Sequence, residues 1–357
     1  MKFDVIVGNP PYQSGTEDGA TASTVYHRFV SAAIEHDPRF VLMMTPSRWF
    51  TGGQGLDEFR ERMIADRRLR TIVDNPRLFD CFPGVEIRGG VSYFLWDRRH
   101  DGDCEFSTRI GGQIVSTAVR DLRRGDGVLV RDNRAMRVIE KAGRVEERLE
   151  AVCAVPKPFG LTILANYPGS VREPFPGAIP LVYSNRVGYS RPDQIQRNHH
   201  WIDRWKVLIP KAGDSHGREV SCVLGEPIAL APGSACTQAY LIAGMFDTAA
   251  ETENYAYYLA TKFVRFLVLQ RQTTQEVTPD RFRFVPMLDM TRRWTDDDLY
   301  GHFGLTADER DHIEATIGPR SVNLSLDSPV PASHLPGGTR HSARTTAHDV
   351  DAEDDEL

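Results

Sequence analysis

The chain has 357 residues, enough for two domains that each bury a hydrophobic core. Its hydrophobic content of 41% and charged content of 26% are typical of a globular protein, and no apolar run approaches the roughly 18 residues that a membrane span requires. Six of the 49 acidic residues lie in the last nine positions, so the remainder balances the 43 lysines and arginines. This balance neither requires nor excludes a nucleic-acid partner, because a local basic face is what neutralises phosphates.

The cysteines argue against disulfides and against a metal centre. All five are widely spaced and none forms a C-x-x-C pair; they stand at positions 81, 104, 153, 222 and 236. This pattern predicts reduced thiols in a bacterial cytoplasm. His199 and His200 are adjacent, but no acidic or cysteine partner lies at ligand spacing. We therefore expect no metal site.

The first hundred residues alternate between short apolar runs and amphipathic segments. Residues 3–7 are expected to form a buried strand in the middle of a sheet. Residues 24–36 are expected to form a helix, with Val25, Phe29, Ala32 or Ala33, and Ile34 on its apolar face. Further strands are expected at 40–44, 69–73 and 91–96, and a charged helix at 57–68. The alternation of strand and helix predicts an open α/β sheet.

Composition changes after this region. Proline and glycine become frequent between Pro156 and Pro192, which predicts a domain change near residue 150. Later helices are expected at 252–271 and 306–317. The segment after Pro319 is rich in Ser, Pro, Gly, Thr and His and is expected to be disordered. We divide the chain into a first domain, a connecting helix, a second domain and a tail, at 1–132, 133–150, 151–318 and 319–357.

The most informative segment is an apolar strand that leads into Asn9-Pro10-Pro11-Tyr12. Ligands of open α/β sheets bind at the carboxyl ends of strands. The oxygens of the Asn9 carboxamide and the Pro10 carbonyl can each accept one N–H of an adenine amino group, which turns the nitrogen lone pair toward a methyl donor. The prolines preorganise these acceptors, and Tyr12 offers a flat face to an unstacked base. In isolation, the same four residues also occur as an ordinary proline-rich turn.

This segment resembles motif IV of the gamma-class adenine-N6 DNA methyltransferases. Residues 45–49 are similar to motif VI of that family, and residues 79–95 are similar to motif VIII, where an aromatic residue holds the other face of the flipped base. The match implies Phe82 as the first choice for that role and Phe79 as the second. Residues 156–161 and 294–300 resemble the fused methylase–specificity proteins of type II restriction–modification systems.

The resemblance implies an α/β fold: a partial Rossmann-like methyltransferase sheet, an α+β target-recognition domain and the disordered C-terminal tail. It also implies S-adenosylmethionine as methyl donor. In the family, a glycine loop and a ribose-binding acid precede motif IV, and neither precedes Asn9 here. A permuted loop around Gly233 lacks the second glycine and the following acid; the pairs Gly111-Gly112 and Gly337-Gly338 read as turns. We expect a missing N-terminal segment or a cofactor-binding partner chain, and an open apolar edge at residues 3–7.

A basic stretch of the second domain is the expected face for double-stranded DNA. Residues 186–218 hold seven basic and three acidic residues with interleaved aromatics, which suits a phosphate track. A solvated surface over a small core is the alternative. The expected DNA contacts, including a second set on the 252–271 helix, are Arg186, Arg191, Lys206, Lys211, Lys262 and Arg271.

Together these features predict site-specific methylation of adenine N6 in duplex DNA after base flipping, within a restriction–modification or related defence system. Two rivals remain open. The chain could be a non-catalytic specificity subunit, which cofactor binding would test. It could also act on RNA or protein glutamine, since those enzymes share the Asn-Pro-Pro-Tyr segment; a comparison of duplex DNA, RNA and protein substrates would decide.

Overall fold

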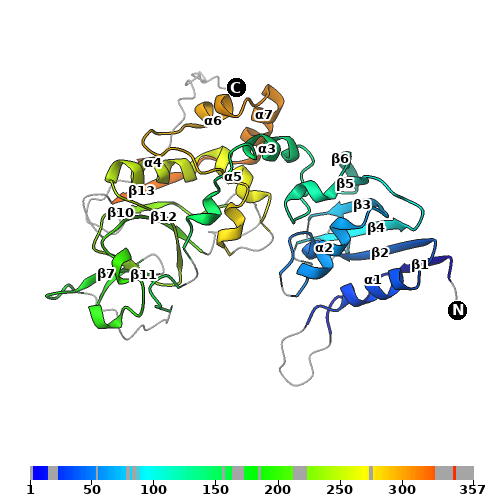
Figure 1. The fold of residues 1–357 in the computed structure, drawn as a ribbon, viewed down its shortest axis with the longest axis horizontal. Helices are drawn as coiled ribbons and strands as arrows, with labels where there is room; N and C mark the ends of the chain where they lie inside the picture. Colours follow the sequence, from blue (N-terminus) through cyan, green and yellow to red (C-terminus); the bar gives the residue numbers. More distant parts are fainter. Residues whose placement is uncertain are drawn as a thin grey trace, which may run out of the picture. The chain divides into compact units, whose positions relative to one another are not determined.

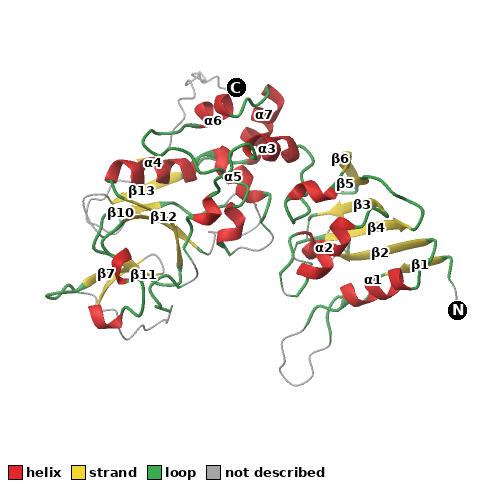
Figure 2. Cartoon of the chain, in the orientation of Figure 1, coloured by secondary structure: helices red, strands yellow, loops and turns green. Residues whose placement is uncertain are grey.

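The computed structural model describes residues 3–14, 23–53, 55–77, 81–82, 87, 89–154, 157–162, 173–183, 186–211, 223–272, 276–325 and 341–342. The chain forms two compact units, which we describe separately: residues 1–141 with 269–274, and residues 142–268 with 275–357. Both combine helices with strands (Figures 1 and 2). The change from one unit to the other falls inside the expected connector at 133–150.

A mixed six-stranded sheet with the order β1-β2-β4-β3-β5-β6 forms the first unit. Strands β1 and β2 are parallel and α1 joins them, β4 runs antiparallel between β2 and β3, and β3 pairs in parallel with β5. The expected turn at Gly111 and Gly112 is present and connects β5 to β6, with positive φ at both glycines. The elements are β1 (Val5–Gly8), α1 (Tyr26–Glu35), β2 (Phe40–Pro46), the 3-10 turn η1 (Ser47–Phe50), α2 (Asp57–Ala65), β3 (Leu69–Asn75), β4 (Val91–Asp97), β5 (Cys104–Ile110), β6 (Gln113–Arg120), η2 (Leu122–Gly125) and α3 (Ala135–Ala142). The α/β expectation is confirmed.

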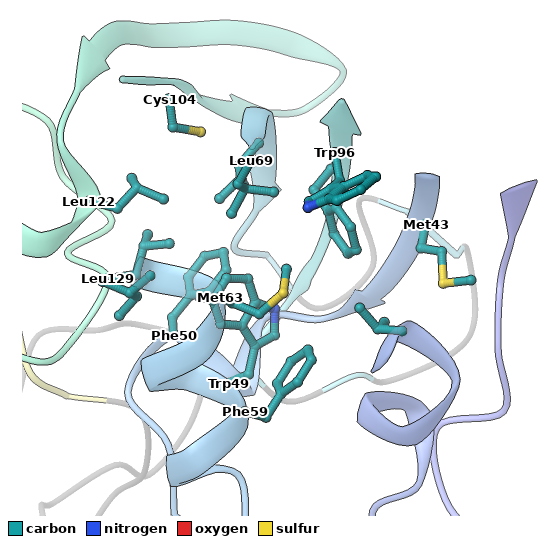
Figure 3. Packing of buried hydrophobic residues seen from close by; sticks show 14 of the residues in the cluster. Met43, Trp49, Phe50, Phe59, Met63, Leu69, Trp96, Cys104, Leu122 and Leu129 are labelled. Atoms are coloured by element: carbon teal, nitrogen blue, oxygen red, sulfur yellow. The ribbon is translucent and has the colours of Figure 1, made fainter. Parts of the chain in front are cut away.

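One face of this sheet carries the core of the first unit. Helices α1 and α2 and the turn η1 all pack on it, and Figure 3 shows Trp49 and Phe50 among the buried side chains. The buried side of α1 consists of Tyr26, Val30 and Ala33. The expected face was wrong at Phe29, which is 47% exposed, whereas Ala33 and Ile34 pack on the core as expected.

The opposite face of the sheet is only partly covered. Side chains alternate between the faces of a strand, and the residues that point away from the core are apolar. Val7 is 68% exposed and its register partner Leu42 is 40% exposed; Val5 is also exposed, and Met44 and Tyr93 are half-buried. The expectation of a buried central strand is therefore wrong, because β1 lies at the sheet edge. The expectation of an open apolar edge there is confirmed.

The second unit has two sheets, with the orders β12-β9-β10-β13-β14 and β11-β7-β8. The elements are η3 (Leu149–Ala151), β7 (Ile179–Tyr183), β8 (Arg186–Ser190), η4 (Pro192–Gln194), η5 (His199–Trp201), β9 (Trp205–Pro210), β10 (Ile228–Leu230), β11 (Ala235–Cys236), β12 (Tyr240–Phe246), α4 (Ala249–Ala260), α5 (Lys262–Leu269), η6 (Pro279–Phe282), α6 (Asp296–His302), α7 (Ala307–Thr316), β13 (Ser321–Ser325) and β14 (His341–Ser342). Helix α4 packs on the larger sheet. This is the expected α+β unit.

Three expected elements differ from the structure. The 133–149 helix is shorter, because α3 ends at Ala142. The 252–271 helix is two helices: Thr261 is extended, and the Asp296 carboxylate accepts the amide hydrogens of Lys262 and Phe263 at 3.1 and 2.9 Å, which caps α5. The prediction of a disordered tail was wrong at the start of that segment, because Ser321–Ser325 form β13, which pairs in parallel with β10. The helix at 306–317 is confirmed as α7, with a capping box at Thr306.

Candidate functional site

The Asn9–Tyr12 segment leaves the carboxyl end of β1. Strands β1, β2 and β3 point the same way, because β1 is parallel to β2 while β2 and β3 are both antiparallel to β4. The carboxyl ends of these three strands therefore lie together along one edge of the sheet. This edge holds Asn9 after β1, the turn after Pro46 and Asn75 at the end of β3. This is the edge where open α/β sheets bind ligands.

Two candidate hydrogen-bond acceptors lie at this edge: the Asn9 carboxamide oxygen and the Pro10 carbonyl oxygen. Asn9 is exposed and Pro10 is buried. Within the described residues, no hydrogen bond involves the Asn9 side chain or the Pro10 carbonyl. The chain after them is fixed, because the Tyr12 carbonyl accepts the Val25 amide at 3.2 Å and Gln13 bridges Thr24. The acceptors are thus free while their backbone is held, as recognition of an amino group requires.

Tyr12 connects this edge to the core. Its ring packs edge to face on Tyr26, with centroids 6.4 Å apart. The hydroxyl of Tyr12 is buried and has no hydrogen-bond partner in the described part of the chain. Burial, and after it the charge of the Cys81 thiol, raises the pKa of Tyr12 to about 12, so the phenol is neutral at physiological pH.

The second candidate segment follows β3, whose carboxyl end lies at the same end of the sheet as Asn9. In this segment Phe82, the first choice for base stacking, is half-buried and next to Cys81. Phe79, the second choice, lies outside the described residues. The stacking role of either phenylalanine remains a prediction.

A buried polar cluster at this edge was not foreseen. Asp74, near the end of β3, is fully buried. It accepts a hydrogen bond from Ser47 Oγ at 2.7 Å and from Arg131 Nη2 at 3.2 Å. Burial raises the pKa of Asp74, while Arg131 and then Ser47 oppose that shift. The available signal was an acidic residue at the carboxyl end of an apolar strand, beside the 45–49 turn.

The described residues do not fit S-adenosylmethionine as a complete site. Asp74 is an acid at a strand end, but Ser47 and Arg131 already occupy it and it is sealed from solvent. Gly233, the permuted candidate, has φ +98 and belongs to the second unit, between β10 and β11. The described residues near Asn9 supply acceptors for a substrate amine but no glycine-loop cradle for the cofactor.

The structure contradicts two of the expected DNA contacts. Lys206 is 1% exposed, and its Nζ donates to the Ile202 carbonyl at 3.1 Å. Burial lowers its pKa to about 8. Arg271 is also buried, and its Nη1 donates to the Asp126 carbonyl at 3.3 Å. Basic residues inside a strand or at a buried helix end point inward here, which residue counts alone do not reveal.

The other expected contacts are partly exposed or outside the description. Arg191 is exposed and pairs with its neighbour Asp193 at 3.0 Å. Lys211 pairs with Glu276 at 3.4 Å, and Lys262 pairs with Glu314. The side chain of Arg186 is not described. The DNA face of the second unit therefore remains a prediction, and Arg191 is its best exposed member.

The described residues contain neither a metal-ligand cluster nor a membrane-spanning helix. Among the described residues, no three His, Cys, Asp or Glu side chains gather as metal ligands. In the same part of the chain, no helix has the length and apolar character to span a bilayer.

Known proteins match the part of the chain that contains Asn9. Residues 1–82 match the model of the Eco57I restriction-modification methylase family. The N-terminal part of this chain is therefore similar to restriction-modification methylases. An uncharacterised adenine-specific methylase of Mycoplasma pneumoniae (strain ATCC 29342 / M129 / Subtype 1) is 32% identical over 146 residues, which cover 40% of this chain and 34% of that protein. The chain thus spans about a third of the length of the curated relative that it matches.

Solved structures of restriction–modification proteins are also similar to parts of this chain. The type IIG restriction endonuclease BpuSI is 13% identical, with a TM-score of 0.36 over 87% of this chain and 48% of that one. The methyltransferase subunit of a type I system from Streptococcus thermophilus is 15% identical, with a TM-score of 0.24 over 30% of this chain and 26% of that one. These TM-scores are too low to establish a shared fold.

Proposed function

We propose that this chain carries the substrate-amine half of an enzyme that methylates adenine N6 in duplex DNA, within a restriction–modification system of the bacterial cytoplasm. One observation carries the proposal: the unpaired acceptors of Asn9 and Pro10 stand at the carboxyl edge of the sheet, inside the segment that matches adenine methylases. Because the match lies on this segment, a purely non-catalytic specificity subunit is disfavoured.

In this function each residue acts on the base. The Asn9 carboxamide oxygen and the Pro10 carbonyl oxygen accept the two amino hydrogens of an adenine that has left the helical stack. Tyr12 supports one face of the base, and Phe82 is proposed for the other. S-adenosylmethionine, which methylases of this kind generally use, supplies the methyl group when bound. We assign the choice of DNA sequence to the second unit.

Substitution at Asn9 tests this function. We expect Asn9→Ala to lower the methylation rate by about 10²–10³, as expected for the loss of one preorganised hydrogen-bond partner, with little change in DNA affinity because phosphate contacts dominate binding. Gln13→Ala, which removes an exposed amide from the same turn, is the control. The assay offers duplex DNA, RNA and protein to the chain together with the polypeptide encoded immediately upstream. Near-normal turnover of Asn9→Ala would overturn the proposal.

The cofactor is proposed to be held by a further α/β element, in the same polypeptide or in a partner chain. The bare face beside β1, with Val7 and Leu42 exposed, is its docking surface. Contiguous apolar surface is rarely left open on a monomer, and a sheet edge can accept another strand. The element that docks must bring the glycine loop and ribose-binding acid that the described residues lack.

Two measurements test this arrangement. Calorimetry on the chain alone should show weak or no binding of S-adenosylmethionine; tight stoichiometric binding would contradict it. In the assembled protein, Leu42→Lys should abolish that binding while the chain stays folded, because Leu42 is 40% exposed. Val119→Lys, at a residue 67% exposed on β6, is the matched control and should leave binding unchanged.

A further inference from the structure

A row of buried polar side chains crosses the sheet one residue short of its carboxyl edge. Thr45 on β2 and Asp74 on β3 are both register partners of Ser92 on β4, and all three are fully buried. A buried carboxylate is costly unless it is paired and hydrogen-bonded. Asp74 is paired on two sides, by Ser47 Oγ at 2.7 Å and by Arg131, whose Nε lies 3.2 Å from Asp74 Oδ2.

Both partners of Asp74 also hold a backbone that leads to the candidate base-binding segment. Arg131 donates to the Gly89 carbonyl, and the Ser47 amide donates to the Gly90 carbonyl at 3.0 Å. The guanidinium of Arg131 lies over the Phe50 ring, 5.2 Å from its centroid. Arg131 is therefore fixed between the core and the chain that enters β4.

The two stems of this segment also touch each other directly. Gly90 has φ +79, and a Cβ there would lie 2.2 Å from the Asn75 carbonyl oxygen and 2.7 Å from the Pro76 Cα. The exit from β3 and the entry to β4 thus form one close-packed base. Cys81 and Phe82 lie between these stems in the sequence, and β3 ends at the same end of the sheet as β1, the strand that leads to Tyr12.

We propose that Arg131, with Asp74 and Ser47, is a positioning residue that fixes the stems of the segment that carries Cys81 and Phe82, so that Phe82 is held at the end of the sheet where Tyr12 receives a flipped base. This inference rests on the proposed methyltransferase function and adds to it a residue that touches neither base nor cofactor. A purely structural role for Arg131 predicts something different: a general loss of stability without a local change at Cys81.

Cysteine labelling separates the two roles without an activity assay. The full chain is treated with iodoacetamide, and the alkylation rate of each cysteine is followed by mass spectrometry. We expect Arg131→Met to speed alkylation of half-buried Cys81 by at least about fivefold through local opening, with no change at Cys104, which is buried in the core of the same unit. Equal acceleration at both cysteines, or none at Cys81, would overturn the proposal.

Arg120→Met is the matched control. Arg120 is also a half-buried arginine of this unit; it lies over the Phe106 ring at 4.6 Å and donates to the Val130 carbonyl. Among the described residues it makes no hydrogen bond to the stems at Gly89 and Gly90, so its loss should leave the Cys81 rate unchanged. Faster Cys81 labelling in this control would show that any arginine loss loosens the unit, and would count against the proposal.

Activity supplies the second readout. In the assembled methyltransferase, Arg131→Met should lower kcat by about 10- to 100-fold with a smaller change in KM, since misplacement of a clamping group by about 1 Å has effects of this size. Arg131→Lys should restore part of the loss, because it keeps the charge beside Asp74 but not the forked donor. An unchanged kcat in a variant whose Cys81 is alkylated faster would overturn the positioning role.

Asn9→Ala separates the failure of this inference from the failure of the proposed function. This variant should leave the alkylation rate of Cys81 normal. If it also retained methylation, the proposed function would fail while the labelling result stood.

Discussion

Tyr12 meets Tyr26 edge to face, with ring centroids 6.4 Å apart and ring planes at 78°. Tyr26 in turn meets Phe59 at 6.2 Å, and Phe59 meets Trp49 at 5.7 Å. Aromatic pairs at these separations contribute beyond the area they bury. The aromatic residue of the candidate site is thus the outer member of a series of rings that continues into the core.

Substitution of Tyr12 should separate its ring from its hydroxyl. The hydroxyl is buried and has no hydrogen-bond partner among the described residues. Because loss of an unpaired polar group is nearly neutral, Tyr12→Phe should leave the free energy of unfolding nearly unchanged and the methylation rate within about twofold to threefold of the parent. Tyr12→Ala removes a half-buried ring and should cost about 1–2 kcal/mol along with most of the activity. Denaturant titration and methylation assays check both. A large loss in Tyr12→Phe would show that the hydroxyl has a partner in the working enzyme.

Gly89 and Gly90 form a natural pair for testing the base of the Phe82 segment. Both have positive φ, but a Cβ at Gly89 would have no heavy atom within 4 Å, whereas one at Gly90 would meet backbone. Gly89→Ala should therefore cost about 1–2 kcal/mol of backbone strain, and Gly90→Ala on the order of 3 kcal/mol or more. Thermal and denaturant unfolding of both variants would show the difference. Equal losses would mean that the close approach to Asn75 relaxes freely.

Lys206 should make stability depend on pH in the alkaline range. Its pKa falls to about 8 in the folded protein from an ordinary value of 10.5, chiefly because it is buried. Between these values the unfolded chain binds more protons, so stability rises as pH increases from about 8 to 10.5, and the cost of the buried charge is fully present at pH 7. Lys206→Met should raise the free energy of unfolding at pH 7 by on the order of 2 kcal/mol and flatten this pH dependence. A less stable variant at pH 7 would show that the bond to the Ile202 carbonyl outweighs the desolvation.

The order of β1 to β4 with α1 and α2 could be predicted from the sequence, because each of these strands is a short apolar run between turn residues. The face of α1 was predicted only in part: Phe29 and Val30 are both apolar and adjacent, and only the packing shows that Val30 points inward and Phe29 outward. The position of β1 at the edge of the sheet depends on which strands pair with it, and the apolar composition of β1 does not show this.

The site was predictable to the extent that it is local. Asn9 to Tyr12 form one turn, so a motif is enough to find them. Arg131 lies 57 residues from Asp74 along the chain and has no motif, so only the fold reveals their pairing. The predicted DNA contacts were the least accurate part, because charge counts do not distinguish a phosphate contact from a buried lysine such as Lys206.

Arg191 is the residue through which DNA binding by the second unit is best tested. It is exposed, and its present partner is the equally exposed Asp193, a kind of ion pair that contributes little to stability. Arg191→Ala should leave folding intact and weaken binding to all DNA sequences alike. If the guanidinium contacts a phosphate, the plot of log affinity against log salt should flatten by about one unit. Lys206→Met is the control, because a buried ammonium cannot reach a phosphate and its loss should leave the slope unchanged. Titrations at several salt concentrations measure both variants. A relaxed sequence preference with an unchanged slope would make Arg191 a base reader instead, and no effect on either quantity would place the DNA face on another part of the chain.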